Sequence, residues 1–234
     1  MFIIQDGVTL GFKGQEQKTI AEKVGIAPET LSRILNKKQK CSKLIAYCIT
    51  KLNDENAEIL DLGCGTGLEL EYYFPLNPTA KITGIDLSVG MLDELEKKFC
   101  KKNISLICGS YFDVPFCENR FDAGVSVESL HHFTAQEKIP LYKKLHKALK
   151  ENGYFILTDY FCKTDEEETL YRETYLSLKK EQGITDNEFY HYDTPLTAEH
   201  EMNALKNAGF HIWLPITAFL SGETYFLSPN PNIT

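Results

Sequence analysis

Three glycines lie directly after the first apolar segment of the chain, in the stretch ILDLGCGTG at 59–67. Gly63, Gly65 and Gly67 would let the backbone turn sharply and bring its amide groups close to a ligand. Such a loop can also serve only to join a strand to a helix. The nicotinamide dinucleotide motif is GxGxxG, whereas this loop reads GxGxG, so its spacing argues against a bound dinucleotide.

Asp86 is the second residue that could do chemistry, because it ends the apolar segment KITGID nineteen residues after Gly67. A carboxylate in this position can accept two hydrogen bonds from the hydroxyl groups of a ribose. The alternative role is a helix cap, for which the nearby Ser88 is better suited. Polar and aromatic residues also follow the next two apolar segments, in GSYFDVPF (109–116) and ESLHHF (128–133).

The elements that must position these residues alternate between strands and helices. We expect strands at 58–62, 81–86, 104–108, 121–127 and 154–160, and helices at 68–74, 88–99, 134–150, 165–182 and 197–208. The last helix is followed by 210–219 and 224–228, which predict an antiparallel hairpin around Ser221-Gly222-Glu223. This order predicts an α/β fold with a doubly wound, mostly parallel, seven-stranded Rossmann-like sheet. Ligands of such sheets bind at the carboxyl ends of the strands.

Composition and charge divide the chain into two parts. Its 234 residues are enough for one α/β domain with a small appendage, and the formal net charge is −8. Residues 1–52 carry nine Lys and Arg but four Asp and Glu, so the excess of acid lies in the rest of the chain. Seven cysteines without a CxxC pair predict neither disulfides nor a zinc site. We find no apolar run of about 20 residues and no secretory signal, and expect a cytoplasmic protein without a membrane span.

Five motifs in this order resemble the class I methyltransferases that depend on S-adenosylmethionine (SAM). They are DLGCGTG (61–67), GIDLSVGML (84–92), GSYFDVPF (109–116), RFDAGVSVESLHHF (120–133) and LHKALKENGYFILTDY (145–160). The resemblance covers about residues 57–228. It implies a methyltransferase domain at 54–234 that acts on a small molecule, uses SAM and releases S-adenosyl-L-homocysteine. Some relatives bind modified forms of SAM, so another transferred group is an alternative.

The resemblance also implies which residues surround the methionine part of SAM. Asp61, Gly63, Cys64 and Gly65 would contact it, largely through backbone groups. Ser126 would lie beside it, close to the path of the methyl group.

A second set of residues would hold the adenosine part. By the same resemblance, Asp86 would bind the ribose hydroxyls, and Leu87 and Met91 would flank the adenine ring. Ser110 and Tyr111 would contact the adenine edge, although many relatives have an acidic residue at the position of Ser110.

Methyl transfer from a sulfonium is an in-line displacement, so alignment of the reactants can supply about 7–11 kcal/mol of the catalysis. A general base is needed only if the acceptor must lose a proton. The candidates are His131, His132 and Tyr160, with Glu128 and Asp159 beside them. Adjacent histidines point in different directions, so one of them can simply pack or cap. We expect no metal site, because neither HExxH nor a comparable spacing occurs.

Residues 161–196 are rich in tyrosine and charge, and we expect them to cover the substrate. The alternative is an amphipathic helix that packs on the sheet.

The basic segment at 1–53 is predicted to be helical, and residues 17–52 resemble a helix-turn-helix of the phage-repressor type. Thr30, Arg33 and Lys37 would then contact DNA or RNA. This predicts a second class of function, a nucleic-acid-binding regulator or an RNA methyltransferase. The other interpretations are a helical cap on the SAM pocket and an element for homodimerisation.

Overall fold

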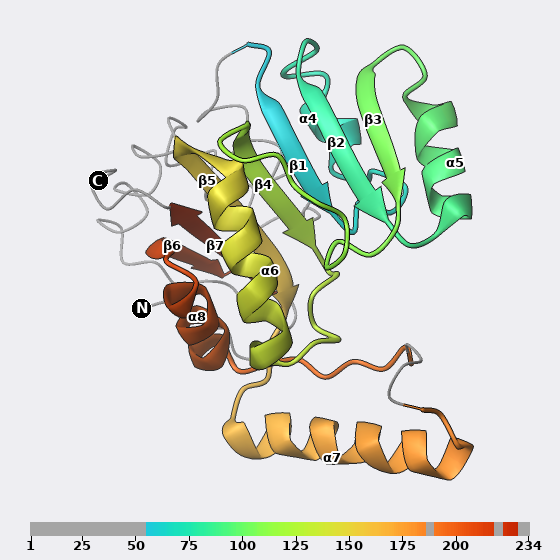
Figure 1. The fold of residues 1–234 in the computed structure, drawn as a ribbon, viewed down its shortest axis with the longest axis vertical. Coiled ribbons are helices and arrows are strands. Elements are labelled where there is room, and N and C mark those ends of the chain that lie inside the picture. The colour runs from blue at the N-terminus through green and yellow to red at the C-terminus, as the bar shows by residue number, and fades with distance from the viewer. Residues whose placement is uncertain (1–54, 186–189, 218–221, 229–234) are drawn as a thin grey trace.

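A computed structural model describes residues 55–185, 190–217 and 222–228 (Figure 1). Its centre is a sheet with the strand order β3-β2-β1-β4-β5-β7-β6. The strands are β1 (Glu58–Leu62), β2 (Lys81–Asp86), β3 (Asn103–Cys108), β4 (Phe121–Val127), β5 (Leu149–Tyr160), β6 (His211–Thr217) and β7 (Gly222–Ser228). The first five are parallel, which confirms the predicted α/β class, while β7 pairs antiparallel with β5 and β6 antiparallel with β7.

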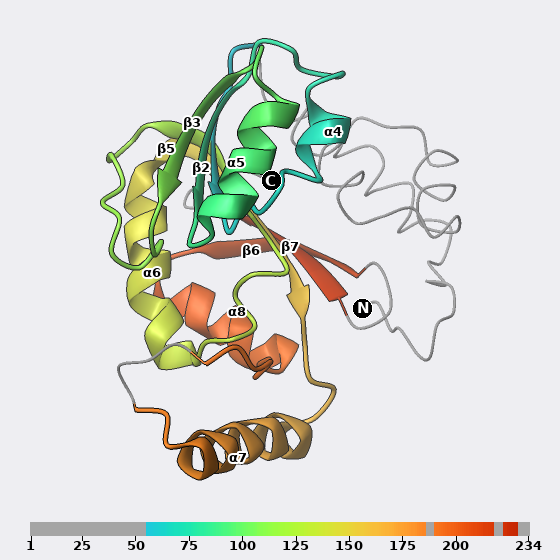
Figure 2. The ribbon, with the colours of Figure 1, turned by 90° about the vertical axis from the view of Figure 1, so that its right-hand side faces the viewer.

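Five described helices connect these strands: α4 (Leu70–Tyr73), α5 (Val89–Lys98), α6 (Ala135–Ala148), α7 (Asp165–Gln182) and α8 (Ala198–Asn207). Figure 2 shows α6 and α4 on opposite sides of the sheet, as a doubly wound fold requires. In both views α7 lies beyond the carboxyl ends of the parallel strands and not on a face of the sheet. This position favours the predicted cover over the alternative of an amphipathic helix on the sheet.

The helix starts follow the polar residues that the sequence places there. Ser88 accepts a hydrogen bond from the backbone N–H of Met91 at the start of α5. Thr134 and Glu137 form a complete capping box at the start of α6, as predicted. Pro140 lies inside α6 and does not delay its start.

Two predicted boundaries are wrong. The chain enters β5 at Leu149, directly after α6, so Asn152-Gly153 lies within the strand and does not end the helix. The reason is a register shift between Phe121 and Ala123 of β4, which lets the residues around Gly153 bulge. A Cβ atom at Gly153 would lie 3.0 Å from backbone atoms of Lys150 and Phe121, which is why glycine fits there. The predicted turn is also displaced, because Gly222 and Glu223 already belong to β7.

A buried ion pair joins α6 to α8. Lys138 and Glu201 are each 1% exposed, and the ammonium group of Lys138 donates to the Glu201 carboxylate. The hydroxyl of Tyr142 donates to the other oxygen of the same carboxylate. The two helices are therefore joined by an ion pair whose opposite charges compensate each other inside a mainly apolar core.

We expect Lys138→Met to lower the free energy of unfolding by about 3 kcal/mol, because it leaves the Glu201 charge buried without a cation. Urea unfolding measures this loss. The double variant Lys138→Met/Glu201→Met should recover most of it, since both charges are then gone. Lys97→Met, which breaks an exposed pair with Glu94, is the control and should leave the unfolding midpoint unchanged. An equally small effect of Lys138→Met would contradict this account of the core.

The N-terminal predictions lie outside the described residues. These are the domain boundary at residue 53 and the nucleic-acid candidates Thr30, Arg33 and Lys37. None of the described helices is both long and apolar enough to cross a bilayer.

Candidate functional site

The glycine loop turns the chain at the end of β1. Gly63, Gly65 and Gly67 have φ angles of 72°, 50° and 68°, a region that favours glycine. The backbone N–H groups of Gly63 and Cys64 both donate to the carbonyl of Ile85, at 2.8 and 3.2 Å, and so tie the loop to β2. A Cβ atom at Gly63 would lie 2.0 Å from the Ser129 hydroxyl, so no larger residue fits unless the loop after β4 moves.

The Asp86 carboxylate is held in a fixed orientation at the end of β2. One oxygen accepts the N–H of Gly65 at 2.9 Å and the other accepts the N–H of Ser88 at 2.8 Å. The side chain remains partly exposed, and each carboxylate oxygen can accept a further hydrogen bond. The Asp86 carboxylate could therefore accept hydrogen bonds from a diol, and its role in binding ribose stays a prediction.

Buried polar atoms without partners occur beside this loop. Among the described residues, Asp61 Oδ2, Glu69 Oε1 and Ser126 Oγ are buried and have no hydrogen-bond partner. Asp61 pairs with Val125 and Ser126 pairs with Leu62, so both lie near the carboxyl ends of the neighbouring strands β1 and β4. Buried polar groups in proteins are almost always paired, so these atoms are candidates for hydrogen bonds to a polar ligand.

Two of these groups are carboxyls with perturbed acidity. Burial raises the pKa of Asp61 well above its usual value, and the neighbouring Glu69 carboxyl raises it further. Burial also raises the pKa of Glu69, against a hydrogen bond from Asp61 that lowers it. A cationic ligand group would relieve this pair. The sequence motifs did not point to Glu69, and its only signal was an acid two residues beyond the last glycine of the loop.

Apolar side chains flank the site where adenine was expected. Leu87 and Met91 are 58% and 47% exposed, which is high for such residues, and the Met91 sulfur lies 3.9 Å from the Cβ position of Gly65. The Tyr111 side chain is buried, and its hydroxyl donates to the carbonyl of Ser129 at 3.0 Å, so it supports the loop after β4. Its contact with the adenine edge stays a prediction. The Ser110 hydroxyl accepts the N–H of Phe112 at 3.2 Å.

The loop after β4 begins with a strained residue. Glu128 has a φ angle of 49°, uncommon for a residue with a side chain, and its N–H donates to Thr158 at 2.8 Å. Its carboxylate shares a hydrogen bond with the hydroxyl of Tyr160, which together with burial raises the pKa of Tyr160. Strain of this kind often persists at functional sites.

His131 is buried and held by Asp159. The distance from His131 Nδ1 to Asp159 Oδ1 is 2.5 Å, and Asp159 also accepts the N–H groups of Leu130 and Tyr160. Burial alone would lower the pKa of His131, but the hydrogen bond and charge of Asp159, with the charge of Asp193, outweigh it and raise the pKa. The ring of Tyr160 meets the His131 ring edge-on at 4.9 Å.

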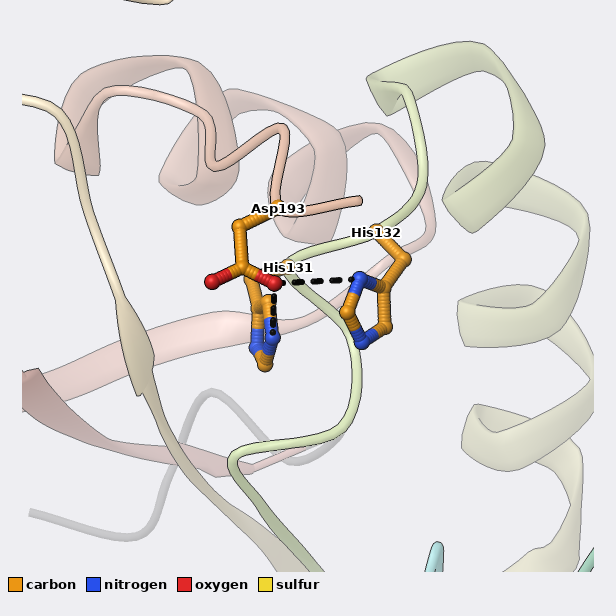
Figure 3. A group of neighbouring side chains, drawn as sticks. All are labelled: His131, His132 and Asp193. Atoms are coloured by element: carbon orange, nitrogen blue, oxygen red, sulfur yellow. Dashed lines mark ion pairs between the residues drawn. The ribbon is translucent and has the colours of Figure 1, made fainter. Parts of the chain in front are cut away.

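His132 packs against His131, with 4.0 Å between the ring centroids. Its Nδ1 lies 3.1 Å from the carbonyl of Tyr192, and its pKa is lowered by burial and by the neighbouring His131. The carboxylate of Asp193 reaches between the two imidazoles (Figure 3). The three predicted catalytic residues thus lie together, and Asp193 is the neighbour that sequence reasoning missed.

The predicted cover is tied to this loop through its last residues. The N–H of Thr194 donates to the carbonyl of His131 at 3.0 Å. Tyr190 and Tyr192 lie parallel with 6.5 Å between their centroids, and each also contacts the ring of Tyr175 on α7. Residues 191–194 therefore lie against the two histidines.

Comparison with known proteins finds a methyltransferase domain. Residues 59–153 match the family model described as a methyltransferase domain. The chain is 28% identical over 210 residues to a biotin biosynthesis bifunctional protein of Teredinibacter turnerae, covering 85% of this chain and 34% of that protein. It is 25% identical over 200 residues to a carboxy-S-adenosyl-L-methionine synthase of Campylobacter lari, covering 78% of this chain and 82% of that protein.

A solved structure shows the same fold. It is described as a SAM-dependent methyltransferase of Methanosarcina mazei, with a TM-score of 0.61, 21% identity, and coverage of 78% of this chain and 96% of that one. The chain spans only about a third of the length of the Teredinibacter protein.

Proposed function

We propose that this chain is a class I SAM-dependent methyltransferase that transfers the methyl group of SAM to a small molecule, which the match to a methyltransferase domain supports. The observation that carries the proposal is the joint fit of the glycine loop and Asp86. Three left-handed glycines and a fixed carboxylate occupy the positions where the methionine part and the ribose of SAM would be held.

The chain's own residues would bind SAM in two parts. Asp86 would accept hydrogen bonds from the ribose hydroxyls, and Leu87 and Met91 would pack against the adenine ring. Asp61 and Glu69 offer unpartnered carboxyl oxygens beside the loop, which suits the ammonium group of the methionine part. SAM supplies an activated methyl group, so the protein's main task is alignment of the acceptor with that group.

The acceptor side is formed by the loop after β4. His132 and Tyr160 both contact the ring of His131 there, and we propose that the three residues bind the acceptor and assist the loss of its proton. The buried Asp159 orients the His131 ring, so Asp159 acts through His131 and does not touch the acceptor. Asp193 and Tyr192 close this side from the cover segment.

The experiment is to incubate the purified protein with SAM labelled with deuterium on the methyl group and with a small-molecule extract. Mass spectrometry should detect a labelled product that is absent without protein. Label that reaches no acceptor, or SAM that itself gains a carboxyl group, would count against the proposal. The second outcome would favour chemistry like that named for the Campylobacter relative.

A nucleic-acid-binding function is the second candidate, supported by the excess of basic residues in 1–52. We expect duplex DNA or RNA to bind at low salt, with a slope of log K against log salt that falls by about 1 for each phosphate contact removed. Fluorescence anisotropy of a labelled duplex measures this slope for Arg33→Ala and Lys37→Ala. Lys97→Ala, on an exposed helix face, is the control. Absence of binding at low salt would leave this segment as a cap or a homodimer contact.

A further inference from the structure

We propose that His131 Nε2, His132 Nδ1 and Asp193 Oδ1 bind a divalent transition-metal ion at the carboxyl end of β4. The Asp193 oxygen lies 3.3 Å from His131 Nε2 and 3.5 Å from His132 Nδ1, and Figure 3 shows it facing both rings. Ligands of a tetrahedral ion with bonds of about 2.1 Å are about 3.4 Å apart. Both separations match this value, and one ligand atom from each of the three residues lies within 4.8 Å of the others, so the three side chains can surround one ion after a small adjustment.

A second observation points to the same site. Asp159 is 1% exposed, and its carboxylate forms a hydrogen bond with Nδ1 of His131. The other ring nitrogen, Nε2, is therefore the one directed at Asp193. Histidines that bind metal commonly have their other ring nitrogen held by a carboxylate, which fixes the tautomer and the ring orientation. Here the supporting carboxylate is itself fixed by the N–H groups of Leu130 and Tyr160.

The charges around His131 also favour a cation. Asp159 and Asp193 lie on opposite sides of one imidazole. A proton on His131 can compensate only one of the two negative charges, whereas a divalent ion at Nε2 compensates both. Most of the Asp193 side chain is exposed, so an ion can enter without unfolding the core.

His132 must change its hydrogen bonding to take part. Its Nδ1 lies 3.1 Å from the Tyr192 carbonyl, to which the ring can donate. Binding an ion requires the tautomer with the proton on Nε2, after which the same carbonyl can serve as a fourth ligand or bind through water. Two imidazoles with a carboxylate suit zinc, iron or cobalt better than magnesium.

The consequence for catalysis rests on the proposed function. An open position on the ion would take the oxygen of a hydroxyl acceptor and lower its pKa, so the O–H bond ionises and the proton leaves to solvent. The oxygen then forms the new bond to carbon as the bond from sulfur to the same carbon breaks. With the ion bound, His131 is a metal ligand. The ion, and not a free imidazole, then promotes the loss of the acceptor's proton.

A second triplet of the described chain provides a matched control. Asp165, Glu168 and His200 also gather three ligand atoms, but the Glu168 oxygen already accepts the N–H of Thr197 at 2.6 Å and contacts His200 Nδ1 at 2.8 Å. No buried carboxylate among the described residues supports the His200 ring. The contacts within this triplet are those of a polar link between α7 and α8.

The test is titration of the full-length chain with Co²⁺, followed by visible absorption, and with Zn²⁺ by equilibrium dialysis. Wild type and His200→Ala should each bind one metal ion per chain tightly. Asp193→Asn should bind the ion at least roughly 100-fold more weakly, because loss of an outer-shell partner alone costs up to about 100-fold in metal affinity. An excess of Mg²⁺ should not displace it. Equal binding by wild type and Asp193→Asn, equal loss in His200→Ala, or displacement by Mg²⁺ would overturn the proposal.

Binding of SAM is measured on the same variants by calorimetry. Asp193→Asn should bind SAM as wild type does, because Asp193 lies on the acceptor side. If wild type binds metal but not SAM, the proposed function fails and the metal site stands. If wild type binds SAM but no metal, only the metal site is lost.

Discussion

Replacement of Asp86 by alanine should weaken SAM binding by roughly 10²–10⁴-fold. Each hydrogen bond to a charged acceptor contributes about 1.5–3 kcal/mol, and the ribose diol offers two of them to this carboxylate. Each 1.4 kcal/mol corresponds to about tenfold in affinity. The carboxylate also holds the N–H groups of Gly65 and Ser88, so its loss loosens the glycine loop as well. Calorimetric titration with SAM measures the change.

The control for this prediction is Asp93→Ala, which removes an exposed carboxylate from α5, the helix that follows Asp86. It should bind SAM as wild type does. Asp86→Asn should fall between the two, because its side-chain oxygen can still accept one of the loop amides. If Asp86→Ala and Asp93→Ala have the same affinity as wild type, Asp86 does not hold the ribose.

Replacement of Gly63 by alanine should lower the free energy of unfolding by about 2–5 kcal/mol and abolish SAM binding. The left-handed φ of 72° costs a residue with a side chain about 1–2 kcal/mol, and overpacking adds about 1–3 kcal/mol. The new Cβ would lie 2.0 Å from the Ser129 hydroxyl and 2.5 Å from the Ser129 Cβ, so the loops after β1 and β4 must separate. Denaturant unfolding and calorimetry measure the two effects.

A second substitution separates the two causes. Gly63→Ala/Ser129→Gly removes the clash but keeps the strained φ, so it should recover the overpacking part of the loss relative to Ser129→Gly alone. The matched control is Gly90→Ala in α5, where a Cβ would meet nothing within 4 Å. Gly90→Ala should be as stable as wild type or up to about 1 kcal/mol more stable. Failure of Ser129→Gly to relieve Gly63→Ala would show that the clash is not the cause.

Much of the fold was predictable because its signals are local. Strands such as Glu58–Leu62 and Lys81–Asp86 are short apolar runs with polar neighbours, and their bounds were predicted to the residue. The Thr134 capping box and the Ser88 cap depend on residues only three apart. The position of Asp86 after β2 follows from the parallel sheet, because the carboxyl ends of parallel strands share one edge.

The parts that were missed depend on contacts between distant segments. Asp193 meets His131 across about sixty residues of sequence, and nothing in the local pattern around Asp193 indicates that contact. The early start of β5 at Leu149 follows from a register shift against β4. The hydrogen bond from the Tyr111 hydroxyl to the carbonyl of Ser129 joins segments eighteen residues apart, and the local sequence gives no sign of it.

The most direct test of the central claim is calorimetric titration of the wild-type chain with SAM and with S-adenosyl-L-homocysteine. The account predicts saturable binding of both ligands at one site, with binding strongly weakened in Asp86→Ala and lost in Gly63→Ala. No binding of either ligand to the folded wild-type chain at millimolar concentration would contradict it.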